Sequence, residues 1–281
     1  MRRSPKLTIA ALSALALFGC SSSDASPVAP VVCTAPGYAA DPQPDPVAIE
    51  QVTASFRDPS GAAVPNLNLQ LCGIDQCRNG KSNALGKIDI APESPNIVLP
   101  ALKYGDGYDF AELAILLGSS PKQDLGELLA LPLPAFADGA VFPKQGSVTN
   151  GDLTLFIDDA KQVDHNELNY TDDSEFVFRT VPVPLEASAQ ALDSSFELAY
   201  GVAPLGTKFC PPAKLSVKNT LAWPPGTDVE IFVQGLETDE LWAPYASWLR
   251  VADARVSSDG SSIDTVSGGI TILSAIALRR K

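Results

Sequence analysis

Strict alternation of apolar and polar residues recurs along this chain and constrains its fold more than any other feature. Residues 66–71 read Asn-Leu-Asn-Leu-Gln-Leu, a pattern that places every leucine on one face of an extended strand. Residues 52–57, 152–157, 195–200 and 214–218 alternate in the same way. The chain has 24 prolines and a single methionine, a composition that disfavours a helical bundle. We therefore expect an all-β fold.

Turn sequences separate these alternating stretches. Asp-Pro-Ser-Gly at residues 58–61 favours a turn, because proline presets the backbone at its second position. Ser-Asp-Gly-Ser at residues 258–261 lies between two alternating stretches and predicts a hairpin. Residues 108–117 and 124–131 could form strands or short helices, since periodicity does not separate the two in short apolar runs.

Residues 49–136 carry a pattern found in one class of β-sandwich. The order is a strand at 52–57, a turn at 58–61, Ala-Ala-Val-Pro-Asn-Leu-Asn-Leu at 62–69 and Ser-Asn-Ala-Leu-Gly-Lys-Ile-Asp-Ile at 82–90. This order resembles the carboxypeptidase-regulatory-like, transthyretin-like or collagen-adhesin B-type domain. The chain departs from that pattern because Ser82 and Asn83 replace Thr-Asp and Ile88 replaces an aromatic residue. The resemblance implies a β-sandwich scaffold without an active site.

Residues 137–281 form a second β-rich region. Its most distinctive parts are the stretch from 199 to 217 and Pro-Pro-Gly-Thr-Asp-Val-Glu-Ile-Phe at 224–232. They more distantly resemble the β-domain by which ankyrins hold spectrin. We therefore expect two β-sandwich-like domains, at residues 49–136 and 137–281.

The N-terminus reads as an export signal. Arg2, Arg3 and Lys6 precede an apolar stretch at residues 7–18, which is too short to span a bilayer. The stretch ends in Leu-Phe-Gly-Cys, which resembles the lipobox of bacterial lipoprotein precursors. The resemblance implies that residues 1–19 are removed and that Cys20 is diacylglycerylated and N-acylated, for example with palmitate. The membrane is then a partner through the lipid. Ser rather than Asp follows the cysteine, which in this family indicates the outer membrane of the cell envelope.

Residues 20–48 contain six prolines in 29 positions and predict an extended, disordered tether. With Cys20 assigned to lipid, an even set of cysteines is left for disulfides: Cys33, Cys72, Cys77 and Cys210. Three pairings are possible. We favour Cys72 with Cys77, because a four-residue hairpin loop would place them opposite each other, and this leaves Cys33 with Cys210. A zinc site is the rival, although two cysteines separated by four residues are poor zinc spacing.

The charge and the polar residues exclude several functions. The net charge is −13, and it becomes −16 once residues 1–19 are removed, so we expect no nucleic-acid partner. His165 is the only histidine, and no Gly-x-Ser-x-Gly motif presents a serine nucleophile. Acidic residues gather between 158 and 175, where a solvated loop is the preferred interpretation and weak calcium binding is the alternative. A glycosidase carboxylate pair stays open, although no two of the many acidic residues stand out. We expect no enzyme activity, catalytic residue, metal or cofactor.

Three aromatic residues lie close together near the C-terminal end: Trp242, Tyr245 and Trp248. Flat rings of this kind could stack on a ligand such as a sugar, but in a β-domain they more often pack in the core. We therefore expect a lipid-anchored surface protein with a structural or binding role, whose partner is an envelope protein or a glycan. The alternative is a lipid-anchored carbohydrate-binding or carbohydrate-active protein.

Overall fold

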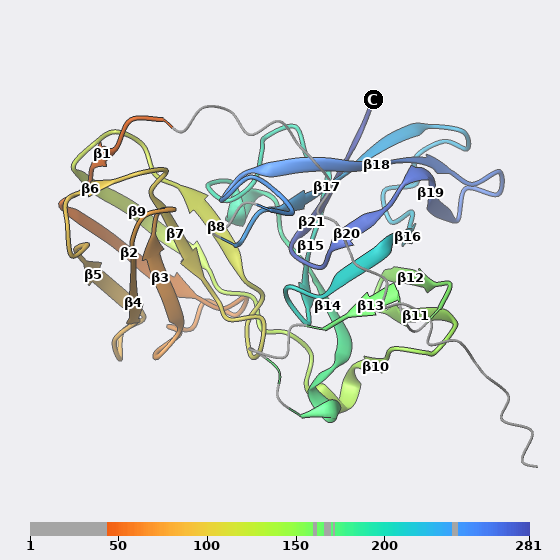
Figure 1. The fold of residues 1–281 in the computed structure, drawn as a ribbon, viewed down its shortest axis with the longest axis horizontal. Helices are drawn as coiled ribbons and strands as arrows, with labels where there is room; N and C mark the ends of the chain where they lie inside the picture. The colour runs from red at the N-terminus through yellow and green to blue at the C-terminus, as the bar shows by residue number, and fades with distance from the viewer. Residues whose placement is uncertain (1–43, 160–161, 166–169, 171, 238–240) are drawn as a thin grey trace, which may run out of the picture. The chain divides into compact units, whose positions relative to one another are not determined.

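The computed structural model describes residues 44–159, 162–165, 170, 172–237 and 241–281. The described part of the chain is built from β-strands and contains no α-helix; its short 3-10 turns include η1 (Phe136–Asp138), η3 (Asp173–Glu175) and η4 (Glu186–Ser188). The prediction of an all-β fold is confirmed (Figure 1). Among these residues, no helix has the length and apolar character needed to cross a membrane.

Three sheets come from the first part of the chain. β1 (Val47–Ala48) pairs with β6 (Asn96–Ile97), and β2 (Gln51–Arg57) lies between β5 (Lys87–Ile90) and β9 (Lys122–Leu129). The third sheet has the order β4 (Cys77–Lys81), β3 (Asn68–Cys72), β7 (Ala101–Tyr104) and β8 (Leu113–Leu116). The alternation at 52–57 and 66–71 therefore predicts β2 and β3, and their apolar side chains are buried as expected.

The two segments left open by the sequence both form strands. Residues 108–117 contain β8, and residues 124–131 contain most of β9. β9 pairs in parallel with β2, the central strand of its sheet. β8 pairs with β7, the strand that precedes it, whereas β9 finds its partner about 70 residues earlier in the chain. Periodicity within these short apolar runs could not distinguish strand from helix.

The second part of the chain forms a twelve-stranded sheet (Figure 1). Along its path lie β10 (Ala140–Val141), β14 (Val177–Pro182), β15 (Leu198–Ala203), β21 (Ile276–Arg280), β17 (Asp228–Gln234), β18 (Trp248–Val256), β19 (Ser262–Gly268), β16 (Lys208–Lys218), β12 (Leu153–Ile157) and β11 (Gly146–Asn150). β13 (Val163–Asp164) and β20 (Ile270–Ile272) also pair with β16. The predicted hairpin around residues 258–261 joins β18 to β19.

The large sheet nearly closes on itself. The side chain of Asn150, at the end of β11, accepts a hydrogen bond from the backbone N–H of Thr180 on β14 at 2.8 Å. Asn150 Nδ2 also donates to the carbonyl oxygen of Asp138 at 3.0 Å, and the Thr180 hydroxyl donates to the Asn150 carbonyl at 2.8 Å. These bonds satisfy polar backbone groups at sheet edges that would otherwise stay open.

The hydrophobic core crosses the predicted boundary between residues 136 and 137. The strands of the three smaller sheets all precede that boundary, and those of the large sheet all follow it. One buried cluster nevertheless combines Phe56 and Tyr104 with Phe196 and Phe232. Gln234, fully buried on β17, donates to the carbonyl of Ala114 on β8 at 2.9 Å and accepts from its N–H at 3.1 Å. The division into two separate domains, at residues 49–136 and 137–281, therefore stays a prediction.

The disulfide predicted across a hairpin loop is present. Cys72 and Cys77 form a disulfide across the β3–β4 loop, with their Cα atoms 4.0 Å apart. Cys210 is half-buried and has no disulfide partner among the described residues. Cys20 and Cys33 lie outside those residues, so the lipid attachment and the pairing of Cys33 with Cys210 stay predictions, as do the signal peptide at 1–19 and most of the tether at 20–48.

Candidate functional site

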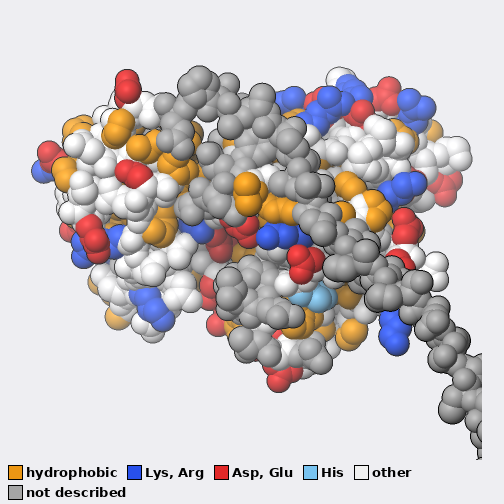
Figure 2. Space-filling view, viewed as in Figure 1, with side chains coloured by type: hydrophobic (Ala, Val, Ile, Leu, Met, Phe, Trp, Pro, Cys, Tyr) orange, Lys and Arg blue, Asp and Glu red, His pale blue; other side chains and the backbone are white. Residues whose placement is uncertain are grey.

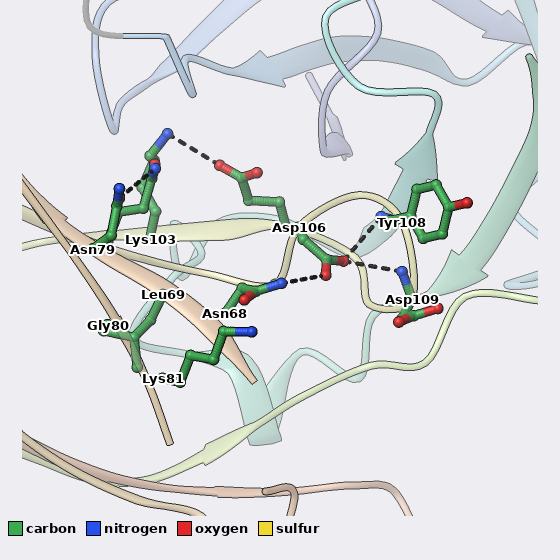
Figure 3. Close-up of a pocket in the computed structure, with 12 residues that line it drawn as sticks. Asn68, Leu69, Asn79, Gly80, Lys81, Lys103, Asp106, Tyr108 and Asp109 are labelled. Carbon is green, nitrogen blue, oxygen red and sulfur yellow. Dashed lines mark hydrogen bonds and ion pairs between the residues drawn. The ribbon is translucent and has the colours of Figure 1, made fainter. Parts of the chain in front are cut away.

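A large polar cavity lies over the outward face of the β4–β3–β7 sheet (Figure 3). Its volume is about 1040 Å³. It is lined by Asn68, Leu69, Gln70, Asn79, Gly80, Lys81, Lys103, Gly105, Asp106, Tyr108, Asp109 and Glu112. Most of these side chains carry hydrogen-bonding groups or charges, so the cavity suits a polar ligand rather than an apolar one.

The floor of the cavity is the polar half of the alternating strands. Leu69 and Leu71 of β3 enter the core, which turns Asn68 and Gln70 outward. In the strand register Gln70 lies opposite Asn79 of β4 on one side and opposite Lys103 of β7 on the other. Gln70 Nε2 donates to Asn79 Oδ1 at 2.9 Å, so this row of side chains is held in place.

The opposite wall is the loop after β7, which Asp106 organises. Its Oδ1 atom accepts hydrogen bonds from the backbone N–H groups of Tyr108, Asp109 and Phe110, at 2.9 to 3.2 Å. Its Oδ2 atom accepts from Asn68 Nδ2 at 2.8 Å, which joins the loop to the floor (Figure 3). The carboxylate of Asp106 therefore shapes the loop, as aspartate does in many tight turns.

Arg179 on β14 supports the same loop from behind. Its side chain is buried, and its guanidinium donates to the carbonyls of Tyr108 at 2.7 Å, Pro134 at 3.2 Å and Gly107 at 3.3 Å. It also lies 3.7 Å from the ring centroid of Phe136. Burial lowers the pKa of Arg179, yet the group stays charged at neutral pH because arginine is so basic. The loop that forms the cavity wall is therefore supported by contacts within the protein itself.

An ion pair closes one end of the cavity. Lys103 Nζ lies 3.3 Å from Glu112 Oε1 and donates to the carbonyl of Leu236 at 2.9 Å. Both side chains are about one-seventh exposed, at 13% and 14%. Burial raises the pKa of Glu112, and Lys103 opposes that rise. A small cavity of about 80 Å³ lies behind this pair.

Several hydrogen-bonding groups face the cavity without a partner in the described part of the protein. They are the ammonium of Lys81, the carboxylate of Asp109, Asn68 Oδ1, Gln70 Oε1 and Asn79 Nδ2. The side chains of Lys81 and Asp109 project from opposite sides of the cavity, from the floor and from the loop (Figure 3). The free set thus contains both donors and acceptors in a preformed space.

The three aromatic residues considered for ligand stacking, Trp242, Tyr245 and Trp248, lie in separate parts of the core. Trp242 and Tyr245 are buried, with 6% and 1% of their surface exposed. Trp248 is half-buried, packs edge-on against Phe196 and donates from Nε1 to the carbonyl of Ala191 at 3.2 Å. Each ring belongs to a different hydrophobic cluster, so they share no exposed face. Their apolar area is used for packing.

The acidic segment around the single histidine does not assemble a site within the described ranges. The ring of His165 packs against Phe142 and Phe176, at centroid distances of 5.2 and 4.4 Å. No group of three or more His, Cys, Asp or Glu side chains in the described part could hold a metal ion. Glu167, one of the acidic residues considered for calcium, lies outside the described residues.

Basic side chains near the C-terminus are engaged by carboxylates. Arg250 and Arg279 both contact Glu230, at 3.1 and 2.8 Å, and Arg250 also pairs with Asp253. Lys281 lies 2.6 Å from Asp253, and these hydrogen bonds lower the pKa of that carboxyl. Figure 2 shows acidic and basic side chains interspersed on the visible face. Because Arg250, Arg279 and Lys281 are paired with carboxylates, they do not form a free basic cluster that could bind phosphate groups.

The cavity residues were not singled out from the sequence. The available signal was the polar half of the alternating stretch at 66–71, since Asn68 and Gln70 must face away from the core. Nothing local indicated that the loop at 105–112 would stand over them. Asp106 and Asn68 are far apart in sequence and meet only through the pairing of β3 with β7.

Comparison with known proteins adds little. No family model matches the chain, and no curated protein matches it. One solved structure, of a proposed carbohydrate binding protein from Bacteroides uniformis, aligns over 83% of this chain and 80% of its own length. The identity is 8% and the TM-score is 0.23. A likeness this slight carries no argument about fold or function.

Proposed function

We propose that this chain is a lipid-anchored protein of the cell envelope that binds a carbohydrate in the polar cavity over β4, β3 and β7. The observation that carries the proposal is the set of free donors and acceptors on the cavity walls. A side-chain amide offers a donor and an acceptor side by side, which matches the neighbouring hydroxyl groups of a sugar. Polar ligands are held by a few well-placed groups of this kind.

Charge supports a sugar over other polar ligands. The chain has a net charge of −13, and Asp106, Asp109 and Glu112 outnumber Lys81 and Lys103 along the cavity. Polyanions such as nucleic acids or strongly acidic polymers would be repelled. A neutral, hydroxyl-rich ligand pays no such cost and uses the donors and acceptors equally well.

A binding role fits the carboxylates better than a catalytic one. Hydrolysis of a glycoside needs two carboxyl groups that are available to the reacting bond. Asp106 accepts hydrogen bonds through both oxygens within its own loop and from Asn68, and Glu112 is paired with Lys103. We propose on this basis that the cavity holds its ligand unchanged.

Replacing Lys81 by methionine should weaken carbohydrate binding about tenfold. A hydrogen bond from a charged group contributes roughly 1.5–3 kcal/mol, and 1.4 kcal/mol corresponds to one factor of ten. Isothermal titration of the purified 44–281 region with soluble oligosaccharides measures the effect. Lys87→Met is the matched control, because Lys87 is also an exposed lysine and lies on the edge strand β5, outside the cavity. Equal affinities for the two variants would place the ligand elsewhere.

The anchor is tested at Cys20. In the native bacterial host, the wild-type protein should carry acyl groups at residue 20 and lack residues 1–19, because Leu-Phe-Gly-Cys stands at the end of a signal-like apolar stretch. Cys20→Ala should abolish both changes and release the protein from membranes, whereas Cys210→Ala should alter neither. Mass spectrometry of the N-terminal peptide gives the answer. An unmodified N-terminus in the wild type would refute the anchor and leave the cavity proposal standing.

A further inference from the structure

The polar side chains of the cavity floor form a row that crosses the strands. Asn79, Gln70 and Lys103 lie opposite one another on the neighbouring strands β4, β3 and β7. Neighbouring strands are about 4.8 Å apart, so the row presents a polar side chain at that repeat. Along a single strand the outward residues are spaced more widely, at roughly 7 Å. A repeat of about 4.8 Å is close to the length of one sugar residue in an extended chain.

The row has one closed and one open end. At β7 it meets the Lys103–Glu112 ion pair, which is fastened to the carbonyl of Leu236. At the other end β4 is the edge strand of its sheet, and Asn79 is exposed. A chain lying on the row can therefore continue past β4 into solvent, but not past Lys103.

From this arrangement we propose that the cavity takes a segment of about three residues from a linear glycan, lying across β4, β3 and β7. The inference rests on the proposed carbohydrate binding and adds the direction and length of the ligand. The cavity volume of about 1040 Å³ agrees with an oligomer, since it lies just above the roughly 300–1,000 Å³ typical of small-molecule sites. The second row, Asn68 and Lys81, borders the same segment from one side.

The test is the dependence of affinity on chain length. Cello-, malto- and chito-oligosaccharides of one to six residues are titrated against the purified protein. In the series that binds, we expect the affinity to rise at least tenfold from one to three residues and then to stay within about twofold up to six. Asn79→Ala should remove the gain between two and three residues, because it shortens the row at its open end. The control is Asn96→Ala, because Asn96 is an exposed asparagine on strand β6, outside the cavity. This substitution should leave the dependence of affinity on chain length unchanged.

The outcomes separate the two proposals. A single sugar that binds as tightly as the hexamer would overturn the linear segment and leave carbohydrate binding intact. A length profile that Asn79→Ala does not change would also overturn it, because the ligand would then lie off the row. No binding of any series by the folded protein would refute the proposed function itself.

Discussion

Arg179→Met should lower the free energy of unfolding by about 3 kcal/mol, because it removes the charged donor from the half-buried carbonyls of Tyr108 and Pro134 and one of the two donors from that of Gly107. Methionine retains an unbranched apolar side chain, but it loses the cation–π contact with Phe136 and cannot donate a hydrogen bond to the three carbonyls. Urea unfolding followed by tryptophan fluorescence measures the change. The variant should also bind oligosaccharides more weakly, since two of these carbonyls belong to the loop that forms the cavity wall.

The matched control is Arg255→Met. Arg255 has a side chain that is 55% exposed and pairs with Asp228 at 2.8 Å. Exposed ion pairs contribute about 0–1 kcal/mol, so this substitution should change stability little. If Arg179→Met were as mild as the control, the guanidinium would not be supporting the loop, and the rigid wall of the cavity would need another explanation.

Gly105→Ala should destabilise the protein by roughly 3 kcal/mol. Gly105 has a φ of +89°, and a Cβ atom there would lie 2.1 Å from the carbonyl oxygen of Ala111. The left-handed backbone accounts for about 1–2 kcal/mol, and the clash adds overpacking of about 1–3 kcal/mol, since the obstacle is backbone. Thermal or urea unfolding of the purified variant reports the loss.

Gly61→Ala separates these two contributions. Gly61 has nearly the same φ, +85°, but a Cβ atom there would meet nothing within 4 Å. It should therefore cost only the backbone term, about 1–2 kcal/mol. Equal losses for the two variants would mean that the loop after β7 moves aside easily, which would contradict a preformed cavity.

Strands with one buried face could be predicted from the sequence, because burial imposes the period of two. Residues 52–57 and 66–71 alternate, and β2 and β3 follow them closely. β3 begins two residues later than the alternation, because Asn66 has a φ of +58° and does not adopt the extended backbone. The hairpin that carries the Cys72–Cys77 disulfide could also be predicted from the sequence, since the length of its loop places the two cysteines opposite each other.

Long-range pairing could not be predicted in this way. The parallel pairing of β9 with β2, and the contacts from Arg179 to Tyr108 and from Gln234 to Ala114, join residues more than 60 positions apart. Such contacts depend on the whole fold and leave no local periodicity. The same reason hid the cavity, whose floor and wall come from separate segments. Residue type alone was also insufficient at Trp242. A tryptophan can stack on a ligand or pack in the core, and only the structure shows that Trp242 is buried.

The short pairing of β1 with β6 determines how the protein would respond to tension on its N-terminal segment. β1 pairs with β6 over only two residues, Val47 with Ile97 and Ala48 with Asn96, whereas β2 is held by strands on both sides. Tension applied to the N-terminal segment would therefore open β1 before it reached β2, which has more backbone hydrogen bonds to its neighbours. The hairpin closed by Cys72 and Cys77 touches the β6 region through Gln76 and Asp75, while Asn68 and Lys81 occupy the far end of the same strands. Tension on the N-terminal segment would thus act near the Cys72–Cys77 end of β3 and β4, whereas the cavity residues Asn68 and Lys81 lie at the opposite end of these strands.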